Sequence, residues 1–570
     1  MKKWTFQIAG TAIILVGLLA ACTNEFLDQP PQGSLDGALL ANEDGADAAL
    51  ISTYSVLDGW FEQWGDGDPW PASGSNWVWG SVTSDDAYKG SEAGDGPAVT
   101  EAELFQWQPS NSFYNVKFRA VYEGVARSNA TLQLVNDADD ISDEAADRIS
   151  GEAKFLRAHY HFDAYKMWGN IPYYTEEDAE FTKPNNVDVL PLIIADFTDA
   201  MNLLPASQGD AGRATSWAAK AYLGKVYMFQ GDYTNAITQL SDVVENGPYS
   251  LMDCFHDMFN QAFDAGGNTE QILSYQSSIN DGTSDGNNGA WADQLNFPHA
   301  GSPFGCCGFH QPSQNLVNAF KTDADGLPLL TTFNDAAYDP ATDNVDPRLD
   351  WTVGRADVPF LDWGVHTDGW VRDLAYAGPF SGKKNIPHQA QPAQGSGWHP
   401  TALTGVNIPI LRFADIMLLL AEAYVETGDL EAARDLVNQI RTRANNCAQG
   451  AGTDEATIYA DPTDAAITWA NYNVGTYDNA WTDQATAREA VRFERRIELA
   501  MEGHRFFDLR RWGNFVEVMN EYLTSEANVR SYLGAANTVS ERHRLFPLPT
   551  VQIELSKVDG TENLTQNPGW

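Results

Sequence analysis

Positive charge is scarce in this chain. Its 570 residues include 35 Lys and Arg against 78 Asp and Glu, which gives a formal net charge of −43 at pH 7. A surface with this excess of carboxylates repels nucleic-acid phosphates and the anionic faces of membranes. The composition therefore excludes nucleic acid as a partner and excludes electrostatic attachment to anionic lipid.

Cysteine is also scarce, with five residues: Cys22, Cys254, Cys306, Cys307 and Cys447. Their spacing fits no zinc motif. Cys306 and Cys307 are adjacent, which leaves two alternatives, a vicinal disulfide or two free thiols. The stretch from Asp281 to Gly289 is rich in Asp, Asn and Gly, as calcium loops are, but it lacks the closing Glu of an EF-hand. We interpret it as a solvated turn and expect no cofactor.

Long apolar runs are confined to the N-terminus. A basic start at Met1 to Lys3 precedes the apolar stretch from Ile13 to Leu19, and small residues follow, which is the pattern of a secretory signal. The stretch is shorter than the roughly 20 residues of a membrane-spanning helix. No second apolar span follows, so we expect no transmembrane helix after Cys22.

The cysteine that ends this stretch distinguishes it from most signal peptides. Leu19-Ala20-Ala21-Cys22 resembles the lipobox of bacterial lipoproteins, in which cleavage precedes the cysteine and its thiol carries diacylglycerol. The alternative is an ordinary signal peptide with a cysteine nearby. The resemblance implies that the mature chain starts at Cys22 and is held on a membrane by lipid alone.

The length favours more than one lobe, because single cores rarely grow this large. Composition shifts suggest five regions. These are a signal peptide (1–21), a lipidated tether (22–40), an N-terminal helical region (41–260), a loop-rich lobe (261–405) and a C-terminal helical region (406–570).

Helical periodicity dominates outside the loop-rich lobe. Apolar residues recur at helical spacing over 43–57, 113–134, 145–167 and 190–204. The stretches 217–248 and 413–440 share the spacing of a tetratricopeptide repeat, in which small residues such as Gly224 let two helices approach while Leu240 fills the gap between them. We predict a mostly α fold, a scaffold of tetratricopeptide-like helical pairs that carries an irregular lobe.

The stretch 486–512 has the strongest helical pattern and is predicted to be one helix. It places Glu494, Arg495 and Glu498 on neighbouring turns, where charge ladders are feasible. Such a dense set of charges is either a catalytic cluster or a structural ion-pair network that fixes helix packing. We favour the network.

Eighteen tryptophans are present, and many lie in polar, glycine-rich contexts. Those of the loop-rich stretch 59–110 are Trp60, Trp64, Trp70, Trp77, Trp79 and Trp107. They are either exposed plates that bind a ligand or side chains that cap the edge of the core.

Several motifs together resemble the SusD/RagB family of outer-membrane lipoproteins. In chain order they are Phe26-Leu27-Asp28 with Pro30, Arg157 to Phe162 with Gly169 to Pro172, Arg412 to Ile416 with Ala421 to Ala423, Glu494 to Leu499 with Glu502 to Trp512, Leu545 to Pro549, and Gln566 to Gly569. The resemblance spans nearly the whole chain. It implies four tetratricopeptide-like helical pairs and a variable loop-rich lobe.

The resemblance also implies a function without catalysis. A family member captures glycan on the outer membrane, facing the exterior and anchored by lipid, and acts as a lid on a SusC-like TonB-dependent transporter. The expected partners are therefore that transporter and a glycan.

Two segments are expected to hold the ligand, Ser84 to Gly90 and Trp291 to Phe309. A sugar needs aromatic plates for its C–H face and polar groups for its hydroxyls. We predict that the polar groups come from Asp85 and Tyr88, and the plates from Trp291, Phe304 and Phe309.

Two alternatives remain. A secreted glycoside hydrolase would need two carboxyl groups at a defined separation, and the sequence shows no nucleophile elbow, metal set or phosphate loop. A helical-repeat adaptor would bind protein only.

Overall fold

A computed structural model of the chain describes most of it beyond the N-terminus. The described residues are 40–59, 69–178, 180–264, 266–279, 288–299, 301–391, 393–396, 399–450 and 458–570. Cys22, the signal sequence and the tether up to residue 39 lie outside them, as do Trp60, Trp64 and most of the predicted turn at 281–289.

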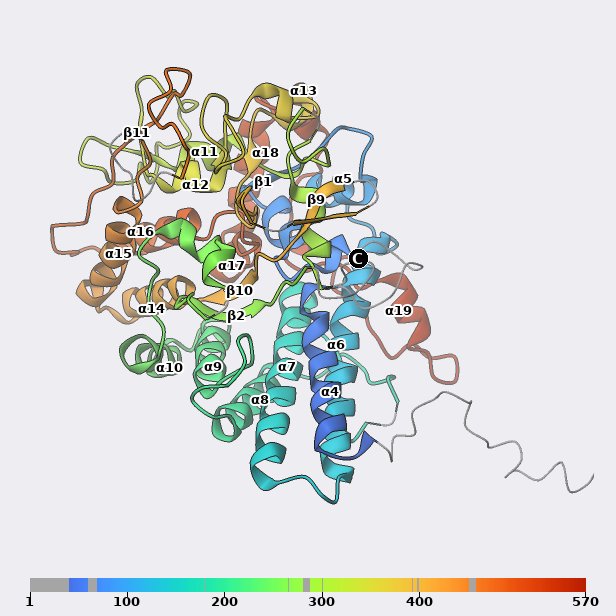
Figure 1. The fold of residues 1–570 in the computed structure, drawn as a ribbon. Helices are drawn as coiled ribbons and strands as arrows, with labels where there is room; N and C mark the ends of the chain where they lie inside the picture. The colour runs from blue at the N-terminus through green and yellow to red at the C-terminus, as the bar shows by residue number, and fades with distance from the viewer. Residues whose placement is uncertain are drawn as a thin grey trace, which may run out of the picture.

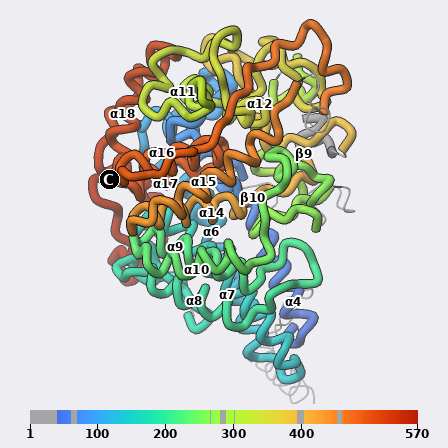
Figure 2. The backbone as a smooth tube through the Cα atoms, turned by 90° about the vertical axis from the view of Figure 1, so that its left-hand side faces the viewer, coloured from blue at the N-terminus to red at the C-terminus, as the bar shows by residue number. Residues whose placement is uncertain are grey.

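The molecule has a helical part and an irregular part. Long helices form the lower half in Figure 1, and short elements joined by loops lie with C-terminal helices (orange to red) in the upper half. The same division is visible after a quarter turn (Figure 2), where segments from the N- and C-terminal thirds of the chain lie against each other. This bears out a mostly helical scaffold that carries a loop-rich lobe.

The scaffold helices match the periodic stretches of the sequence. They are α4 (Glu43–Tyr54), α6 (Ser112–Asp137), α7 (Asp143–Trp168), α8 (Leu190–Leu203), α9 (Ser216–Gln230), α10 (Tyr233–Asn246), α14 (Phe413–Thr427), α15 (Leu430–Asn445), α16 (Gln484–Glu498), α17 (Arg505–Trp512) and α18 (Phe515–Glu526). Short helices are α5 (Pro97–Glu103), α11 (Gln314–Ala319), α12 (Arg348–Thr352), α13 (Leu374–Ala377) and α19 (Thr550–Leu555). Among the helices described, none is both long and apolar enough to cross a bilayer.

The two predicted repeat copies are helical hairpins with the same turn. Gly231 and Gly428 end α9 and α14 in the left-handed region, at φ +77° and +92°, which glycine adopts without steric cost. Asp232 and Asp429 then cap the next helices by accepting hydrogen bonds from the backbone N–H of Asn235 and of Ala432. Each hairpin therefore has a Gly-Asp pair at its turn, and the two turns have the same geometry.

Close packing inside the first hairpin depends on Gly224. A Cβ at this position would lie 2.3 Å from Cδ2 of the buried Leu240. The prediction that Gly224 lets the helices approach and that Leu240 fills the space is confirmed.

The irregular lobe is built from short strands and turns. The strands of the chain are β1 (Ala87–Gly90), β2 (Gln271–Tyr275), β3 (Phe309–Pro312), β4 (Lys321–Thr322), β5 (Asn344–Val345), β6 (Val353–Gly354), β7 (Ser381–Gly382), β8 (Ala393–Ser396), β9 (His399–Thr404), β10 (Ile408–Arg412) and β11 (Asn471–Tyr472). β2 pairs antiparallel with β10, the strand that leads directly into α14. This pairing joins the lobe to the scaffold.

The prediction of one helix over 486–512 is wrong. The stretch breaks into α16 and α17, because Met501 and Gly503 take positive φ values of +65° and +72°. The turn between them packs against the N-terminal region so closely that a Cβ on Gly80 would lie 1.8 Å from the carbonyl oxygen of Gly503. The contact between this turn and Gly80, and not the local sequence, therefore determines where the helix breaks.

The four described cysteines form two disulfides. Cys254 pairs with Cys447, with Cα atoms 5.3 Å apart, and so links the segment that follows α10 to the end of α15. Cys306 pairs with Cys307. Of the two alternatives for the adjacent cysteines, the structure has the vicinal disulfide.

Candidate functional site at the β1–β3 junction

The two segments predicted to share a site meet in the structure. β1 follows Asp86 and pairs antiparallel with β3, which places Tyr88 opposite Gln311 and Gly90 opposite Phe309. Ser313 fixes the other end of the junction, because its hydroxyl donates to the backbone carbonyl of Asp85 at 2.7 Å. The loops that leave these strands therefore lie side by side, although about 220 residues separate them in the sequence.

Asp85 is buried between two arginines. Arg505 Nε lies 2.7 Å from its Oδ1, and Arg496 Nη2 lies 3.1 Å from its Oδ2. Burial alone would raise the pKa of Asp85, but the two guanidinium charges lower it to about 2. Burial raises the pKa of the neighbouring Asp86 to about 6. The Asp85 carboxylate thus ties β1 to the C-terminal helices.

Tyr88 is also buried, and its hydroxyl both donates and accepts a hydrogen bond within the protein. The hydroxyl donates to a Glu526 carboxylate oxygen and accepts from the backbone N–H of Gln314 at 3.0 Å. Burial next to that carboxylate raises the pKa of Tyr88 well above its usual value. Tyr88 therefore connects β1, α11 and α18.

The three predicted aromatic plates lie in the core as well. Trp291 and Phe309 are each 3% exposed, and Phe304 is fully buried. Phe304 packs against Phe297 and Trp363, with ring centroids 5.4 and 4.7 Å apart.

The prediction that these five side chains contact a ligand directly is corrected by their burial. A sugar stacks on an aromatic face only where solvent also reaches it, and a hydroxyl binds a carboxylate only where that carboxylate is free. Asp85, Tyr88, Trp291, Phe304 and Phe309 instead support the surface above them. Trp77, Trp79 and Trp107 are buried too, so for these tryptophans the core alternative holds.

Above the junction lies a polar cluster that we call the rim: Glu92, Asp95 and Arg372 are partly exposed, His299 is half-buried, and Ser91 is buried beneath them. Arg372 reaches across from the lobe and forms ion pairs of 2.7 Å with Glu92 and 2.6 Å with Asp95. Its guanidinium also donates to the Ser91 hydroxyl at 3.0 Å. The side chains of Arg372, Glu92 and Asp95 are 29%, 46% and 37% exposed, so the rim faces solvent.

Lys89 holds the rim turn from below. Its Nζ donates to the backbone carbonyls of Glu92 at 2.7 Å and of Asp95 at 2.6 Å. The same ammonium lies 4.8 Å from the ring centroid of Tyr376, which stacks on Tyr532 at 4.1 Å. This aromatic pair therefore packs against Lys89, and Tyr376 itself is buried.

His299 is anchored by its backbone N–H, which donates to the carbonyl of Trp370 at 2.9 Å. Partial burial, together with the charge of Arg372, lowers the pKa of His299. His299 is therefore neutral near pH 7 and offers a hydrogen-bonding ring rather than a charge.

The chemistry that the rim offers is recognition of hydroxyl groups. Its carboxylates accept hydrogen bonds and its guanidinium donates them, whereas the buried Ser91 hydroxyl is bonded to Asp95 and Arg372. Among the described residues, no three His, Cys, Asp or Glu side chains converge as metal ligands do.

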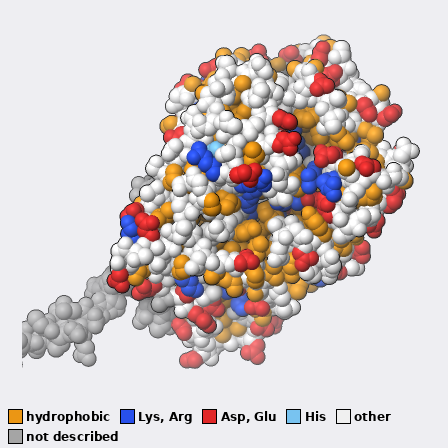
Figure 3. Space-filling view, turned by 180° about the vertical axis from the view of Figure 1, so that it is seen from behind, with side chains coloured by type: hydrophobic (Ala, Val, Ile, Leu, Met, Phe, Trp, Pro, Cys, Tyr) orange, Lys and Arg blue, Asp and Glu red, His pale blue; other side chains and the backbone are white. Residues whose placement is uncertain are grey.

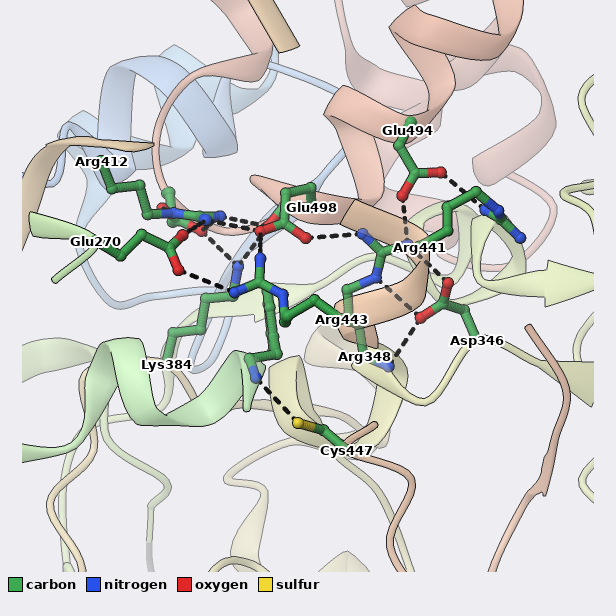
Figure 4. Close-up of polar contacts among 12 residues, drawn as sticks. Glu270, Asp346, Arg348, Lys384, Arg412, Arg441, Arg443, Cys447, Glu494 and Glu498 are labelled. Atoms are coloured by element: carbon green, nitrogen blue, oxygen red, sulfur yellow. Dashed lines mark hydrogen bonds and ion pairs between the residues drawn. The ribbon is translucent and has the colours of Figure 1, made fainter. Parts of the chain in front are cut away.

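The densest charge cluster lies elsewhere, under α16. Figure 4 shows Glu498 and Glu494 surrounded by arginines from several segments. Arg348 lies 2.7 Å from Glu498 and 2.6 Å from Glu494, and all three side chains are fully buried. Arg412 adds a contact of 2.7 Å to Glu498. The structural alternative is confirmed, but the partners of these glutamates come from other elements and not from the predicted ladder within the helix.

Sequence reasoning missed the rim. Glu92 and Asp95 come just after the predicted ligand segment Ser84 to Gly90. Their closeness to this segment in the sequence is the signal that could have located them. Nothing local in the sequence indicates that Arg372 meets Glu92, because 280 residues separate them.

Comparison with known proteins identifies two family models in this chain. The model described as "SusD family" matches residues 269–570. A second, described as "Starch-binding associating with outer membrane", matches residues 51–228. Together they cover most of the scaffold and of the lobe, and α10 lies between the two matches.

Individual relatives are similar along most of their length. A SusD-like protein of Formosa agariphila is 24% identical over 541 residues, which are 91% of this chain and 94% of the relative. Surface glycan-binding protein A from Bacteroides fluxus superposes with a TM-score of 0.67 at 22% identity, covering 93% of this chain and all of that one. The corresponding protein from Bacteroides thetaiotaomicron, solved in complex with laminarihexaose, gives 0.66 at 18% identity, covering 92% and 99%. These structures share the fold.

Proposed function

Because the chain belongs to the SusD family, we propose that it captures carbohydrate at the cell surface and delivers it to a SusC-like TonB-dependent transporter, for which it serves as a lid. The observation that carries the proposal is the fold shared along nearly the whole chain with proteins named for surface glycan binding, one of them solved with laminarihexaose. The match to a family model described as associating with the outer membrane supports the location.

The rim supports carbohydrate as the ligand. Two partly exposed carboxylates and a guanidinium lie within hydrogen-bonding distance of one another. Such a set of hydrogen-bond acceptors and donors suits the hydroxyl groups of sugars. We therefore assign the rim as the glycan contact, in place of the buried side chains beneath it.

The rim also favours binding over hydrolysis. A glycosidase needs one carboxyl group that gives up a proton and a second that acts as nucleophile or base. Glu92 and Asp95 both bond to the guanidinium of Arg372, which lies between them. The two carboxylates are therefore held by one cation and do not flank an open space for a glycosidic bond.

The anchor in this proposal is the lipid on Cys22. Residues 23–40 then form a tether between the membrane and the scaffold, which starts at α4. This arrangement lets the body move relative to the transporter while it stays attached.

A glycan array with purified residues 23–570 tests the proposal. We expect the protein to bind one class of oligosaccharide and to release no reducing ends from it over several hours. Replacing both rim carboxylates, Glu92→Gln with Asp95→Asn, should weaken that binding roughly tenfold, because charged hydrogen bonds to the sugar are lost.

The matched control replaces Asp139 and Asp140 with asparagine. These two exposed carboxylates lie in the turn between α6 and α7, so their loss should leave binding unchanged. Reducing ends released by the wild-type protein would refute the binding function, and an array without any bound glycan would do the same.

A further inference from the structure

A second solvent-accessible hollow lies apart from the rim. It is a groove of about 510 Å³ between α16, α18 and the turn at residues 330–335. Seen from behind, the molecule is hollowed near its centre, where basic and acidic side chains lie among hydrophobic ones (Figure 3). The volume is within the range of small-molecule sites.

Three arginines line this groove, and two of them are neutralised. Arg505 binds both carboxylate oxygens of Asp85, at 2.7 and 2.9 Å. Arg496 pairs with Asp85 and Asp86, at 3.1 Å each. The positive charges of Arg496 and Arg505 are therefore neutralised by these buried carboxylates.

Arg492 is different. It forms no ion pair with any residue in the described part of the chain, and its buried Nε has no hydrogen-bond partner there. Its guanidinium lies 4.8 Å from the ring centroid of Trp512, a cation–π contact. Partial burial lowers the pKa of Arg492. The nearby carboxylates of Glu422, Glu489 and Glu426, which form no ion pair with it, offset this lowering only in part. An anion in the groove would complete this site.

The other lining groups limit what kind of anion fits. Phe333 and Phe493, with ring centroids 5.4 Å apart, form an aromatic wall. Glu489, Asp335 and Glu521 are exposed at the edges of the groove. They accept hydrogen bonds from hydroxyls and repel a dense polyanion such as an acidic peptide. A ligand with many hydroxyls and sparse negative charge satisfies all of these groups.

We propose that this groove is a second carbohydrate site, which binds a sugar carrying one anionic substituent through Arg492 stacked on Trp512. The inference goes beyond the proposed function, since glycan capture at the rim does not require it. The shared chemistry is an oxyanion on a sugar, and its source is either a carboxylate or a sulfate ester.

Four tetrasaccharide probes distinguish these sources. A hyaluronan tetrasaccharide carries one carboxylate per disaccharide and is paired with its carboxyl-reduced form. A κ-carrageenan tetrasaccharide carries one sulfate per disaccharide and is paired with its desulfated form. Calorimetry on residues 23–570 should show at least one anionic probe binding roughly tenfold or more tightly than its neutral partner, as a charged hydrogen-bond pair provides.

Variants in α16 test whether this preference for the anionic probe arises in the groove. Arg492→Gln should abolish it. Arg488→Gln, one turn earlier on the same helix, should retain it, because Arg488 is paired with Glu426. Arg492→Lys keeps the charge without the planar fork and should retain part of the preference.

Unfolding temperatures close to that of the wild type show that the variants fold. The inference is overturned if neither anionic probe exceeds its neutral partner, or if Arg488→Gln abolishes the preference as Arg492→Gln does. Neutral glycans that still bind at the rim would then leave the proposed function standing.

Discussion

Asp85, Tyr88 and Phe309 hold the rim in position without reaching solvent. Asp85 binds Arg496 and Arg505, Tyr88 binds Glu526, and Phe309 packs in the core. A binding surface needs such support, because its exposed groups contact a ligand well only if the backbone beneath them is fixed. Under the proposed function, these residues act on ligand binding through the rim.

Replacing Trp291 with alanine tests this division of roles. Trp291 is buried, so the change should lower the free energy of unfolding by about 3–5 kcal/mol. Denaturant unfolding gives the value, and Phe181→Ala, at a side chain 54% exposed, serves as the control with little effect. If the variant is as stable as the wild type but binds glycan more weakly, Trp291 contacts the ligand directly and the assignment to the core is wrong.

Asp85 gives a prediction about pH. Its folded pKa of about 2 lies below the value of about 3.9 in an unfolded chain. The stability that it contributes is therefore present above pH 4 and is lost as the pH falls toward 2, by about 2–3 kcal/mol. Asp86 has a higher pKa, of about 6. Protonation of Asp86 and protonation of Asp85 therefore affect the stability of the protein in different pH ranges.

The variant Asp85→Asn isolates this contribution. It leaves two buried guanidinium groups with one carboxylate fewer, so we expect a loss of about 3–5 kcal/mol at pH 7. The difference in stability between the wild type and the variant should shrink as the pH falls from 4 to 2. A difference that stays constant over this range would show that the ion pair is not the cause.

Helical hairpins are the elements that local sequence specifies best. The Gly-Asp turns and the periodic apolar residues of α9, α10, α14 and α15 act within about 35 residues, so the sequence predicts them well. The break between α16 and α17 was not predicted, because Gly503 takes its conformation against Gly80, more than 400 residues away.

Gly224→Ala tests the packing of the first hairpin. Alanine favours a helix over glycine by about 1 kcal/mol, but its Cβ would overlap buried Leu240. We expect the overlap to win, with a net loss of about 1–3 kcal/mol. The double variant Gly224→Ala with Leu240→Val should recover part of that loss. A single variant more stable than the wild type would contradict the close approach of α9 and α10.

In the molecule as a whole, the scaffold could be predicted and the ligand surface could not. The family motifs lie in packed helices and buried ion pairs, so they identify the fold. The prediction that 84–90 and 291–309 belong together was sound, since β1 pairs with β3. Which side chains face outward depends on contacts such as Arg372 with Glu92, and these follow only from the folded chain.

The lipid anchor is tested on the intact cell. Cys22→Ala removes the thiol that carries diacylglycerol, so the protein should leave the membrane fraction and appear in the soluble fraction. Fractionation followed by immunoblotting measures this. Retention of the variant in the membrane fraction with a lipid still attached would refute the lipobox assignment.

The central claim is that carbohydrate binds at the rim above the β1–β3 junction. The most direct test is a crystal structure of residues 23–570 with the neutral oligosaccharide that binds most tightly on the array. We expect sugar density within hydrogen-bonding distance of Glu92, Asp95 and Arg372. Sugar density on another face, with the rim left to solvent, would contradict the assignment.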